Sequence, residues 1–326
     1  MSKWMITGGG GFVASHFIDL LQSEKEEVCV TYRWNEDLSR IKHVENITRI
    51  PADLLDLSSL IRAVADHKPD VISHLAAQSF VNDSFVMPII TVETNTVGTV
   101  NLMEAVRIVR DYIHNGYDPV IHVCSSSEVY GRVNADELPI TEQHPFRPGN
   151  QYAIGKIGED ATADFYHKYY GFKVITTRMF THTGPGRTMM SAENNFARQI
   201  ARIEHGLQEP VIRHGNLDSV RTWADVRDAV RAYYLLGKNG RPGEAYNIGG
   251  KDVRTIAEML DFLISLSPMA DKIKKEVDPS LIRRLDVNLQ VPDCSKFQRD
   301  TGWEPVYTFE RTMEDLLNWW RVCVVS

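Results

Sequence analysis

The chain has 326 residues, of which 43% are hydrophobic and 24% are charged, with a formal net charge of −7. This composition argues against a disordered chain, and the charge argues against non-specific binding to nucleic acid. The length predicts one large domain with a smaller lobe. The four cysteines show neither paired nor metal-type spacing, so we expect reduced thiols and no metal. Without a secretory leader or an apolar run of membrane length, the expected compartment is the cytoplasm.

Short apolar strands alternate with helical patterns over the first 180 residues. The predicted strands are Trp4–Thr7, Glu27–Tyr32, Val71–Leu75, Val120–Cys124 and Lys173–Thr177, and the predicted helices are Phe12–Ser23, Leu57–Asp66, Thr94–Asp111 and Tyr152–Tyr170. Each strand is nearly continuously apolar, which is typical of a parallel sheet covered on both faces. We predict an α/β fold: a Rossmann-type doubly wound parallel sheet with a smaller C-terminal α/β substrate-binding lobe.

The alternation weakens after Phe180. The segment His182–Asn194 is predicted as a loop, followed by the helices Asn195–His205, Asp225–Lys238, Thr255–Ser265 and Glu310–Val322 and the strands Val211–His214 and Tyr246–Ile248. We expect an NADP-binding domain at 1–180, to which 225–249 returns. The substrate-binding lobe is expected at 181–224 and 250–326, with ligands held beyond the carboxyl ends of the strands.

A glycine-rich segment follows the first predicted strand. Gly8 and Gly11 precede Phe12 and Val13, where a helix is predicted to begin. Glycines let the backbone approach a pyrophosphate, and the helix N-terminus attracts its negative charge. The alternative is a flexible turn, but the position before a complete α/β alternation favours a dinucleotide site.

The second predicted strand ends in Tyr32-Arg33-Trp34-Asn35, which contains no acid. An acid at this place would bind the ribose hydroxyl of NAD, whereas an arginine suits the 2′-phosphate of NADP. Arg33 therefore favours NADP, with NAD as the alternative and a simple surface role for Arg33 as a third interpretation. Asp53 and Leu54 lie where the adenine is expected.

Tyr152 and Lys156 are four residues apart and so share one face of a predicted helix. A lysine ammonium lowers the pKa of a neighbouring phenol, which can then take a proton from a sugar hydroxyl. Ser126 and Glu128 follow the strand before this helix and add a hydroxyl and a second acid/base. A Tyr–Lys pair alone commonly marks an exposed helix face, but together with the glycine-rich segment these four residues predict a catalytic site.

Basic residues are frequent in the segments expected to line the substrate cleft: Arg178, His182, Arg187, Arg213, Arg221 and Arg283. Each alone is more commonly a surface residue than a ligand. As a set in an acidic protein they indicate an anionic nucleotide substrate, because guanidinium groups match diphosphates.

Several motifs resemble the extended short-chain dehydrogenase/reductase superfamily, in its nucleotide-sugar epimerase/dehydratase branch. The motifs similar to GDP-mannose 4,6-dehydratases or to GDP-4-keto-6-deoxymannose reductases are 74–81, 126–131, 184–186, 206–210, 215–218, 221–223, 225–228 and 278–279 with Arg283. The resemblance runs essentially from end to end. Two departures lie beside the expected substrate and leave the hexose open: Asn150-Gln151 stands before Tyr152 where the family usually has Ser-Pro, and Thr181 stands before His182 where it usually has Asn.

The resemblance implies further site residues. Leu75, Ala76 and Ala77 would flank the nicotinamide, and Arg221 and Arg283 would hold the substrate phosphates. The full set expected to bind substrate is Gln78, Ser79, His182, Arg187, Asn195, Arg213, Asn216, Arg221 and Arg283. Relatives pair the helices that correspond to Thr94–Asp111 and Tyr152–Tyr170 across a two-fold axis, so a homodimer or homotetramer is expected.

These observations predict a nucleotide-sugar 4,6-dehydratase that uses NADP and acts on a GDP-linked hexose. The alternatives are an NADPH-dependent 4-keto-6-deoxy nucleotide-sugar reductase or an epimerase, because the same Tyr–Lys pair serves those reactions and similar reductases also carry the glutamate. A more remote alternative is a nucleotide-sugar-binding module without catalysis.

Overall fold

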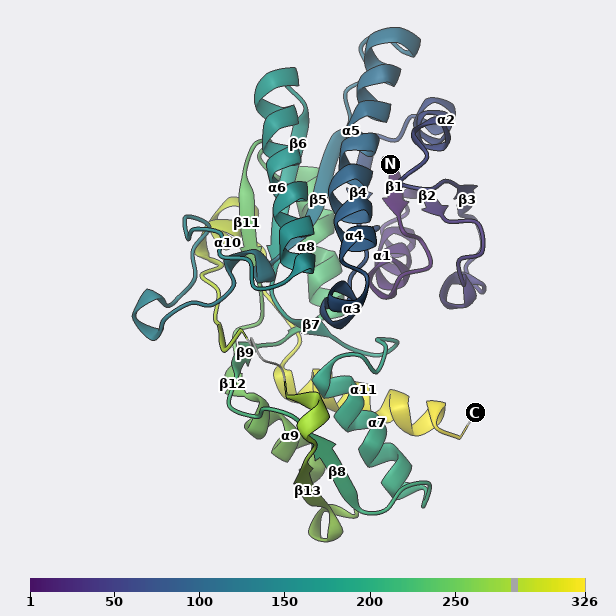
Figure 1. Ribbon diagram of the computed structural model, residues 1–326. Helices are drawn as coiled ribbons and strands as arrows, with labels where there is room; N and C mark the ends of the chain where they lie inside the picture. The colour runs from purple at the N-terminus through teal and green to yellow at the C-terminus, as the bar shows by residue number, and fades with distance from the viewer. Residues whose placement is uncertain (283–286, 326) are drawn as a thin grey trace.

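A computed structural model describes residues 1–282 and 287–325, which form two lobes (Figure 1). The first lobe is built on a seven-stranded sheet with the order β11-β6-β5-β4-β1-β2-β3, in which every neighbouring pair is parallel. Its strands are β1 (Lys3–Thr7), β2 (Glu27–Tyr32), β3 (Thr48–Pro51), β4 (Val71–His74), β5 (Val120–Ser126), β6 (Lys173–Met179) and β11 (Ala245–Ile248).

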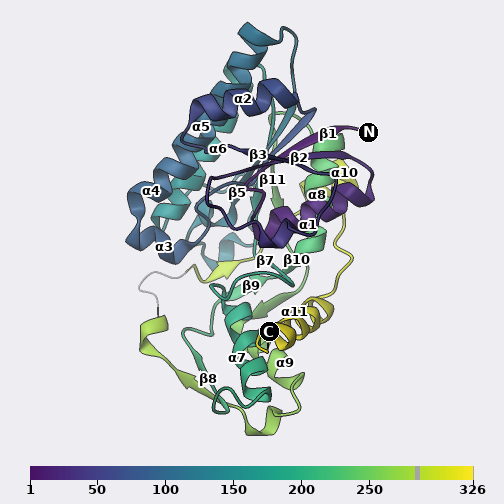
Figure 2. The same cartoon turned by 90° about the vertical axis from the view of Figure 1, so that its right-hand side faces the viewer.

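Helices cover both faces of this sheet (Figure 2). One face carries α2 (Leu57–His67), α5 (Gly98–Ile108) and α6 (Gln151–Tyr170), and the other carries α1 (Phe12–Ser23), α8 (Val226–Asn239) and α10 (Ser295–Thr301). Each face has its own apolar core, one around Phe17 and Tyr233 and the other around Leu102 and Ile121. The predicted doubly wound fold is confirmed.

The helix predicted at Thr94–Asp111 belongs to a longer helical run. It begins with α3 (Val81–Val86) and α4 (Pro88–Val92), and π-helical turns at η2 (Glu93–Val97) and η3 (Val109–Ile113) flank α5. Pro88 occupies the start of α4, where its missing N–H costs nothing. Within the first π turn, the Asn95 side chain bonds both the N–H and the C=O of Gln78, so the irregular turn supports the loop after β4.

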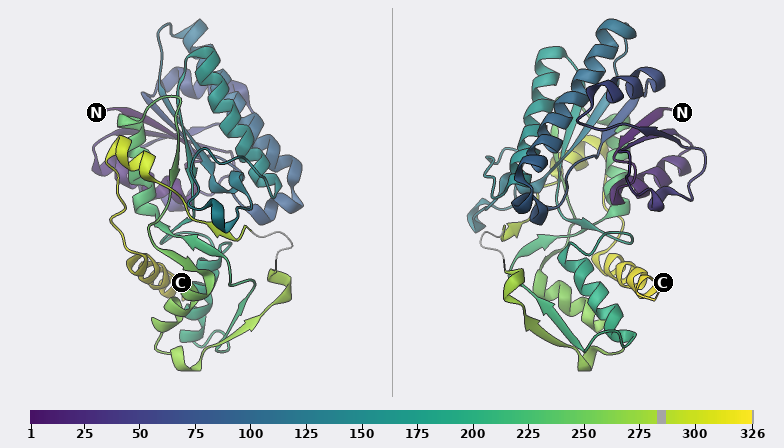
Figure 3. Two further views of the ribbon diagram at one scale, coloured as in Figure 1. Left: turned by 90° about the vertical axis from the view of Figure 1, so that its left-hand side faces the viewer. Right: turned by 45° about the vertical axis from the view of Figure 1, so that its right-hand side comes forward.

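The second lobe packs three helices over short strands. Its helices are α7 (Ala192–Glu204), α9 (Ile256–Ser265) and α11 (Phe309–Cys323), and its strands form the pair β8 (Val211–His214) with β13 (Lys274–Val277) and the set β12 (Val253–Thr255), β9 (Val220–Thr222) and β14 (Leu289–Gln290). Figure 3 shows this lobe beyond one end of the sheet, with the C-terminus in it. Its core includes Ile200, Leu260 and Leu316.

The loop predicted at His182–Asn194 is wrong at both ends. β7 (His182–Thr183) pairs with β10 (Ala224–Asp225), and α7 already begins at Ala192. The helix starts early because the buried Asn194 amide donates to Thr183 Oγ1 and accepts from the Trp320 indole. α8 and β11 lie in the first lobe, while the exact domain boundaries remain a prediction.

Short 3-10 turns complete the structure: η1 (Ser39–Ile41), η4 (Ser127–Tyr130), η5 (Ala135–Glu137), η6 (Ala270–Lys272) and η7 (Pro279–Leu281). Within the described residues, no helix is both long and apolar enough to cross a bilayer.

Candidate active site

The glycine-rich loop between β1 and α1 has the shape that a dinucleotide pyrophosphate needs. Gly8 adopts a φ of 74°, and a Cβ there would lie 2.9 Å from the Cα of Ala76. A Cβ at Gly9 would lie 2.7 Å from that of Val30. No side chain in the described part of the chain caps α1, so its first-turn N–H groups remain for an anion. The loop therefore fits a nicotinamide dinucleotide.

The loop after β2 contains an acid that the sequence reasoning did not use. The Glu36 carboxylate accepts hydrogen bonds from the backbone N–H of Gly10 (3.1 Å) and of Arg33 (2.9 Å). Arg33 itself is exposed. A carboxylate suits a ribose hydroxyl and a guanidinium suits a 2′-phosphate, so both types of group stand at this end of the loop. Glu36 was missed because it lies four residues beyond the strand end.

The remaining residues predicted to bind the cofactor follow β3 and β4. Asp53 uses a carboxylate oxygen to accept from the Leu55 N–H (2.9 Å), and the Leu54 carbonyl accepts from Asn101 (2.8 Å). Thr7 Oγ1 accepts from the N–H groups of Leu75 (3.1 Å) and Ala76 (3.0 Å), which ties the loop after β4 to the glycine-rich loop. This loop continues through Ala77 and Gln78 to the exposed Ser79.

Tyr152 and Lys156 lie on the buried face of α6, beside the end of β5. The Lys156 ammonium is 5.8 Å from the centre of the Tyr152 ring and donates to the Cys124 carbonyl (2.7 Å). Burial raises the pKa of the Tyr152 phenol, while the positive charge of Lys156 and a hydrogen bond with Ser126 act to lower it. The structure thus brings together three of the four residues predicted to be catalytic.

The fourth, Glu128, lies in η4 and is held by two amides. Asn150 Nδ2 donates to one carboxylate oxygen (3.0 Å), and Gln290 Nε2 from β14 donates to the other (3.5 Å). Asn150 also caps α6, since its Oδ1 accepts from the Ala153 N–H (2.8 Å). Neither amide was predicted to act here. An asparagine before a helical pattern is a visible cap signal, whereas Gln290 carries no signal because it lies 162 residues from Glu128.

A further acid in α6, Glu159, was also missed. Its carboxylate accepts from the Lys156 ammonium at 3.0 Å, and both side chains are almost fully buried. The i,i+3 spacing of the two residues is visible in the sequence.

The basic residues grouped by the sequence do not share one role. Arg178 is buried and forms a bidentate pair with Asp160 (both contacts 3.0 Å), so its predicted position as a cleft ligand is wrong. The guanidinium of Arg187 lies 5.7 Å from the centre of the Phe12 ring and donates to the His182 carbonyl, which places it over the N-terminus of α1. Burial lowers the pKa of His182 to about 3, which keeps its ring neutral.

The other predicted substrate ligands lie in the second lobe. Gln199 bonds both Asn195 Oδ1 (3.5 Å) and the backbone of Arg213, so it brings these two residues together. Asn216 is exposed and accepts from the Asp218 N–H. Arg221 in β9 lies opposite Gln290 in the β9–β14 register. Arg283 falls outside the described residues.

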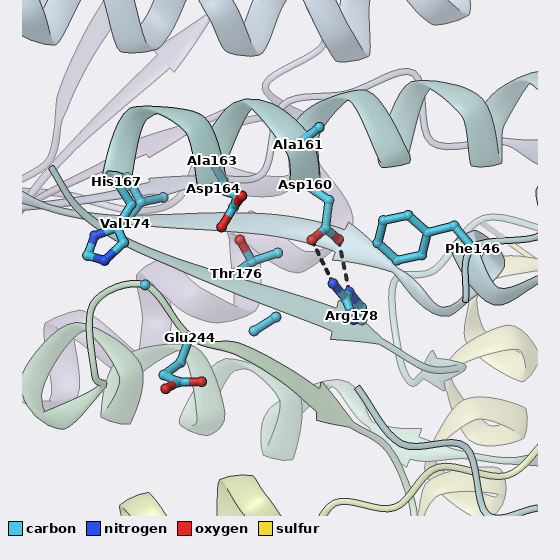
Figure 4. Close-up of a pocket in the computed structure, with 12 residues that line it drawn as sticks. Phe146, Asp160, Ala161, Ala163, Asp164, His167, Val174, Thr176, Arg178 and Glu244 are labelled. Carbon is cyan, nitrogen blue, oxygen red and sulfur yellow. Dashed lines mark hydrogen bonds and ion pairs between the residues drawn. The ribbon is translucent and has the colours of Figure 1, made fainter. Parts of the chain in front are cut away.

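A hollow of about 320 Å³ lies between α6, β6 and the segment 243–245 (Figure 4). Ser126, Glu128, Tyr152 and Lys156 do not line it. The Arg178 guanidinium at its edge is already bound by Asp160, as the dashed lines in Figure 4 show. The positive charge of Arg178 is therefore already paired, and the hollow is separate from the candidate active site.

A tyrosine and a lysine one helical turn apart, beside a doubly wound sheet that opens with a glycine-rich loop, place the chain among the extended short-chain dehydrogenases/reductases. The family model of GDP-mannose 4,6-dehydratase matches residues 5–316. The chain belongs to this family, within the nucleotide-sugar epimerases and dehydratases, and it is an enzyme of the 4,6-dehydratase/reductase type.

Named relatives cover more than one reaction. The chain is 30% identical to a dTDP-glucose 4,6-dehydratase of Haemophilus influenzae over 98% of both chains. It is 31% identical to a GDP-6-deoxy-D-mannose reductase of Pseudomonas aeruginosa over 77% of this chain and 80% of the relative. A solved structure of RMD from Pseudomonas aeruginosa, complexed with NADPH, superposes with a TM-score of 0.82 at 27% identity and covers 99% of this chain and all of that one.

Proposed function

We propose that the protein is a nucleotide-sugar 4,6-dehydratase acting on a GDP-linked hexose. The observation that carries this proposal is the Glu128 carboxylate, which Asn150 and Gln290 hold beside the Ser126, Tyr152 and Lys156 group. A reductase or an epimerase needs acid/base chemistry only at C4. A dehydratase also needs a group that removes the C5 proton and protonates the C6 hydroxyl. Glu128 is placed to serve as that group, which favours the dehydratase, although similar reductases also carry this glutamate.

The proposed reaction uses two acid/base residues in turn. Tyr152 takes the proton of the C4 hydroxyl, with Ser126 bonded to the same oxygen and Lys156 favouring the phenolate. A bound nicotinamide dinucleotide would take the hydride from C4 and give it back at C6. The 4-keto group acidifies C5–H, so Glu128 removes this proton and passes it to the C6 hydroxyl, which leaves as water. Solvent then supplies a proton at C5, Tyr152 releases its own, and the sugar has lost one water without net oxidation.

Two finer points belong to this proposal. The GDP-linked substrate rests on the family match, and dTDP-glucose is the competing substrate, because dTDP-glucose dehydratases are relatives of similar identity. Arg213 and Arg221 suit the diphosphate of either nucleotide. NADP rests on the exposed Arg33, and the carboxylate of Glu36 beside it is the feature that favours NAD. We retain the cytoplasm as the proposed compartment, because all four cysteines are unpaired thiols.

The second candidate is the 4-keto-6-deoxy nucleotide-sugar reductase, favoured by the reductase relative and the NADPH-bound structure. The test incubates the purified protein with GDP- and dTDP-hexoses without added NADPH, and follows the products by mass spectrometry. A dehydratase releases a 4-keto-6-deoxy sugar from one of them. A second assay supplies NADPH and a 4-keto-6-deoxy nucleotide sugar. Consumption of NADPH there, with no dehydration of the hexoses in the first assay, would establish the reductase instead. Mass spectrometry of the co-purified nucleotides identifies the cofactor in the same preparation.

A further inference from the structure

Glu159 is a buried acid that the proposed reaction does not use. Its side chain is 1% exposed and that of Lys156 is 6% exposed, and the two form an ion pair of 3.0 Å inside α6. The second carboxylate oxygen, Oε1, is buried and has no hydrogen-bond partner within the described residues. Burying two charges costs several kcal/mol per ion before their attraction is counted, so this pair needs a reason beyond stability.

The ammonium of Lys156 has three N–H donors. The Cys124 carbonyl at 2.7 Å and Glu159 Oε2 at 3.0 Å each accept one of them, from opposite elements, β5 and α6. These two acceptors fix the position of the nitrogen and leave one donor for the Tyr152 side of the site. Burial acts to lower the pKa of this ammonium, and the negative charge of Glu159 acts to raise it.

We propose that Glu159 is a positioning residue for Lys156: it holds the ammonium in place and charged, and its negative charge moderates the acidity of Tyr152. The proposal deepens the proposed function, because Tyr152 and Lys156 are the residues it acts on. Two opposing effects follow from one contact. Glu159 secures the positive charge that activates the phenol, and it also weakens the field that this charge exerts on the phenol.

The histidines, the thiol and the phenol that surround the pair are held in their neutral forms by burial. Burial lowers the pKa of His74 on β4 and of His122 on β5 to about 3, and it raises the pKa of the Cys124 thiol and of the Tyr233 phenol on α8. Asp160, the next residue of α6, is paired with Arg178. Burial raises the pKa of Glu159 itself to about 7, against the opposing charge of Lys156. Glu159 is thus the group whose charge would change near neutrality, and the acidity of Tyr152 would change with it.

The test measures the phenol pKa of Tyr152 directly, by NMR of protein carrying ¹³C-labelled tyrosine, with the signal assigned from Tyr152→Phe. In Glu159→Gln the Lys156 ammonium keeps the Cys124 carbonyl as an acceptor and stays charged, and its field on the phenol is no longer compensated by a carboxylate. We therefore expect the pKa of Tyr152 to fall by about one unit. The rising limb of the kcat/KM profile should move to lower pH by the same amount. Asp164→Asn is the matched control, because Asp164 lies in the same helix but pairs with the exposed Lys168, and it should leave the pKa unchanged.

An unchanged Tyr152 pKa in a folded Glu159→Gln variant would overturn the proposal, since a purely structural role lowers the melting temperature without moving this pKa. If the variant does not fold, the wild-type protein still decides: titration of the Glu159 carboxyl, whose pKa burial raises, should produce a second inflection in the Tyr152 signal. Its absence would equally contradict the proposal. Both NMR measurements are made without substrate, so they stand whichever reaction the enzyme catalyses.

Discussion

Asn150 joins a structural task to a chemical one. Its side-chain Oδ1 caps α6 by accepting from the Ala153 N–H, and its side-chain Nδ2 donates to the carboxylate of Glu128. The same residue therefore fixes where the helix carrying Tyr152 begins and how Glu128 is oriented toward the substrate. Because the resemblance leads us to expect a serine here, the asparagine is a departure of this chain that the structure explains.

Separating the two tasks of Asn150 gives a first prediction. Serine is also a good helix cap but has no amide that reaches Glu128, so Asn150→Ser should keep the melting temperature and lower kcat about tenfold. Asn150→Ala removes the cap as well and should cost about 1 kcal/mol of stability. Thermal unfolding and steady-state kinetics on both variants distinguish the tasks. Equal activity of Asn150→Ser and wild type would show that Glu128 does not need this amide.

At the scale of elements, regular patterns were predictable and long-range contacts were not. The apolar strands and the glycine-rich loop lie in short stretches whose spacing reports their geometry, and the sheet confirms them. The π-helical turns around α5 depend on Asn95 reaching across to Gln78, and the start of α7 depends on Trp320. Gln290 and Asp160 could not be assigned from the sequence either, because their partners become visible only when distant segments meet.

The fit of the glycine-rich loop against β2 gives a second prediction. A Cβ at Gly9 would lie 2.7 Å from Val30 Cβ and 2.8 Å from its Cγ2, and the buried, β-branched Val30 cannot move away cheaply. Gly9→Ala should therefore displace the loop, at a cost of about 1–3 kcal/mol, and weaken cofactor binding about tenfold or more. Gly149→Ala is the control, because a Cβ there meets nothing within 4 Å. Titration of reduced nicotinamide fluorescence compares the two, and equal affinities would contradict the assigned role of the loop.

At the scale of the molecule, one face of the first lobe carries exposed apolar side chains. They lie on α3, α4, η2 and α6. They include Phe85, Val86, Ile89, Ile90, Val97, Ile154, Phe165 and Tyr169. Exposed apolar patches of this kind commonly mark an interface between chains. Of these, Val97, Ile154, Phe165 and Tyr169 lie in Thr94–Asp111 and Tyr152–Tyr170, the two segments that the family resemblance pairs across a two-fold axis. We therefore propose that this face joins two copies.

A charge introduced into this face should separate the copies. Ile89 is 70% exposed and Ile90 is 53% exposed, so Ile89→Asp with Ile90→Asp should fold normally and behave as a monomer. Light scattering after size exclusion measures the mass of wild type and variant. As a control, Val253→Asp changes an exposed apolar residue of the second lobe and should keep the wild-type mass. A monomeric wild-type protein would contradict the proposed assembly.

The two lobes meet at Glu128 through Gln290, which lies opposite Arg221 in the β9–β14 register. Substrate phosphates held by Arg221 would thus bind next to β14, the strand whose Gln290 orients Glu128. The most direct measurement is the reaction of the purified enzyme with a GDP-hexose in D₂O without added NADPH. We predict a product that has lost one water and gained one deuterium at C5. In Glu128→Gln we expect the rate to fall by about 10²–10⁴-fold with cofactor binding intact. A product that retains all its oxygen atoms, or full activity of Glu128→Gln, would contradict the dehydratase assignment.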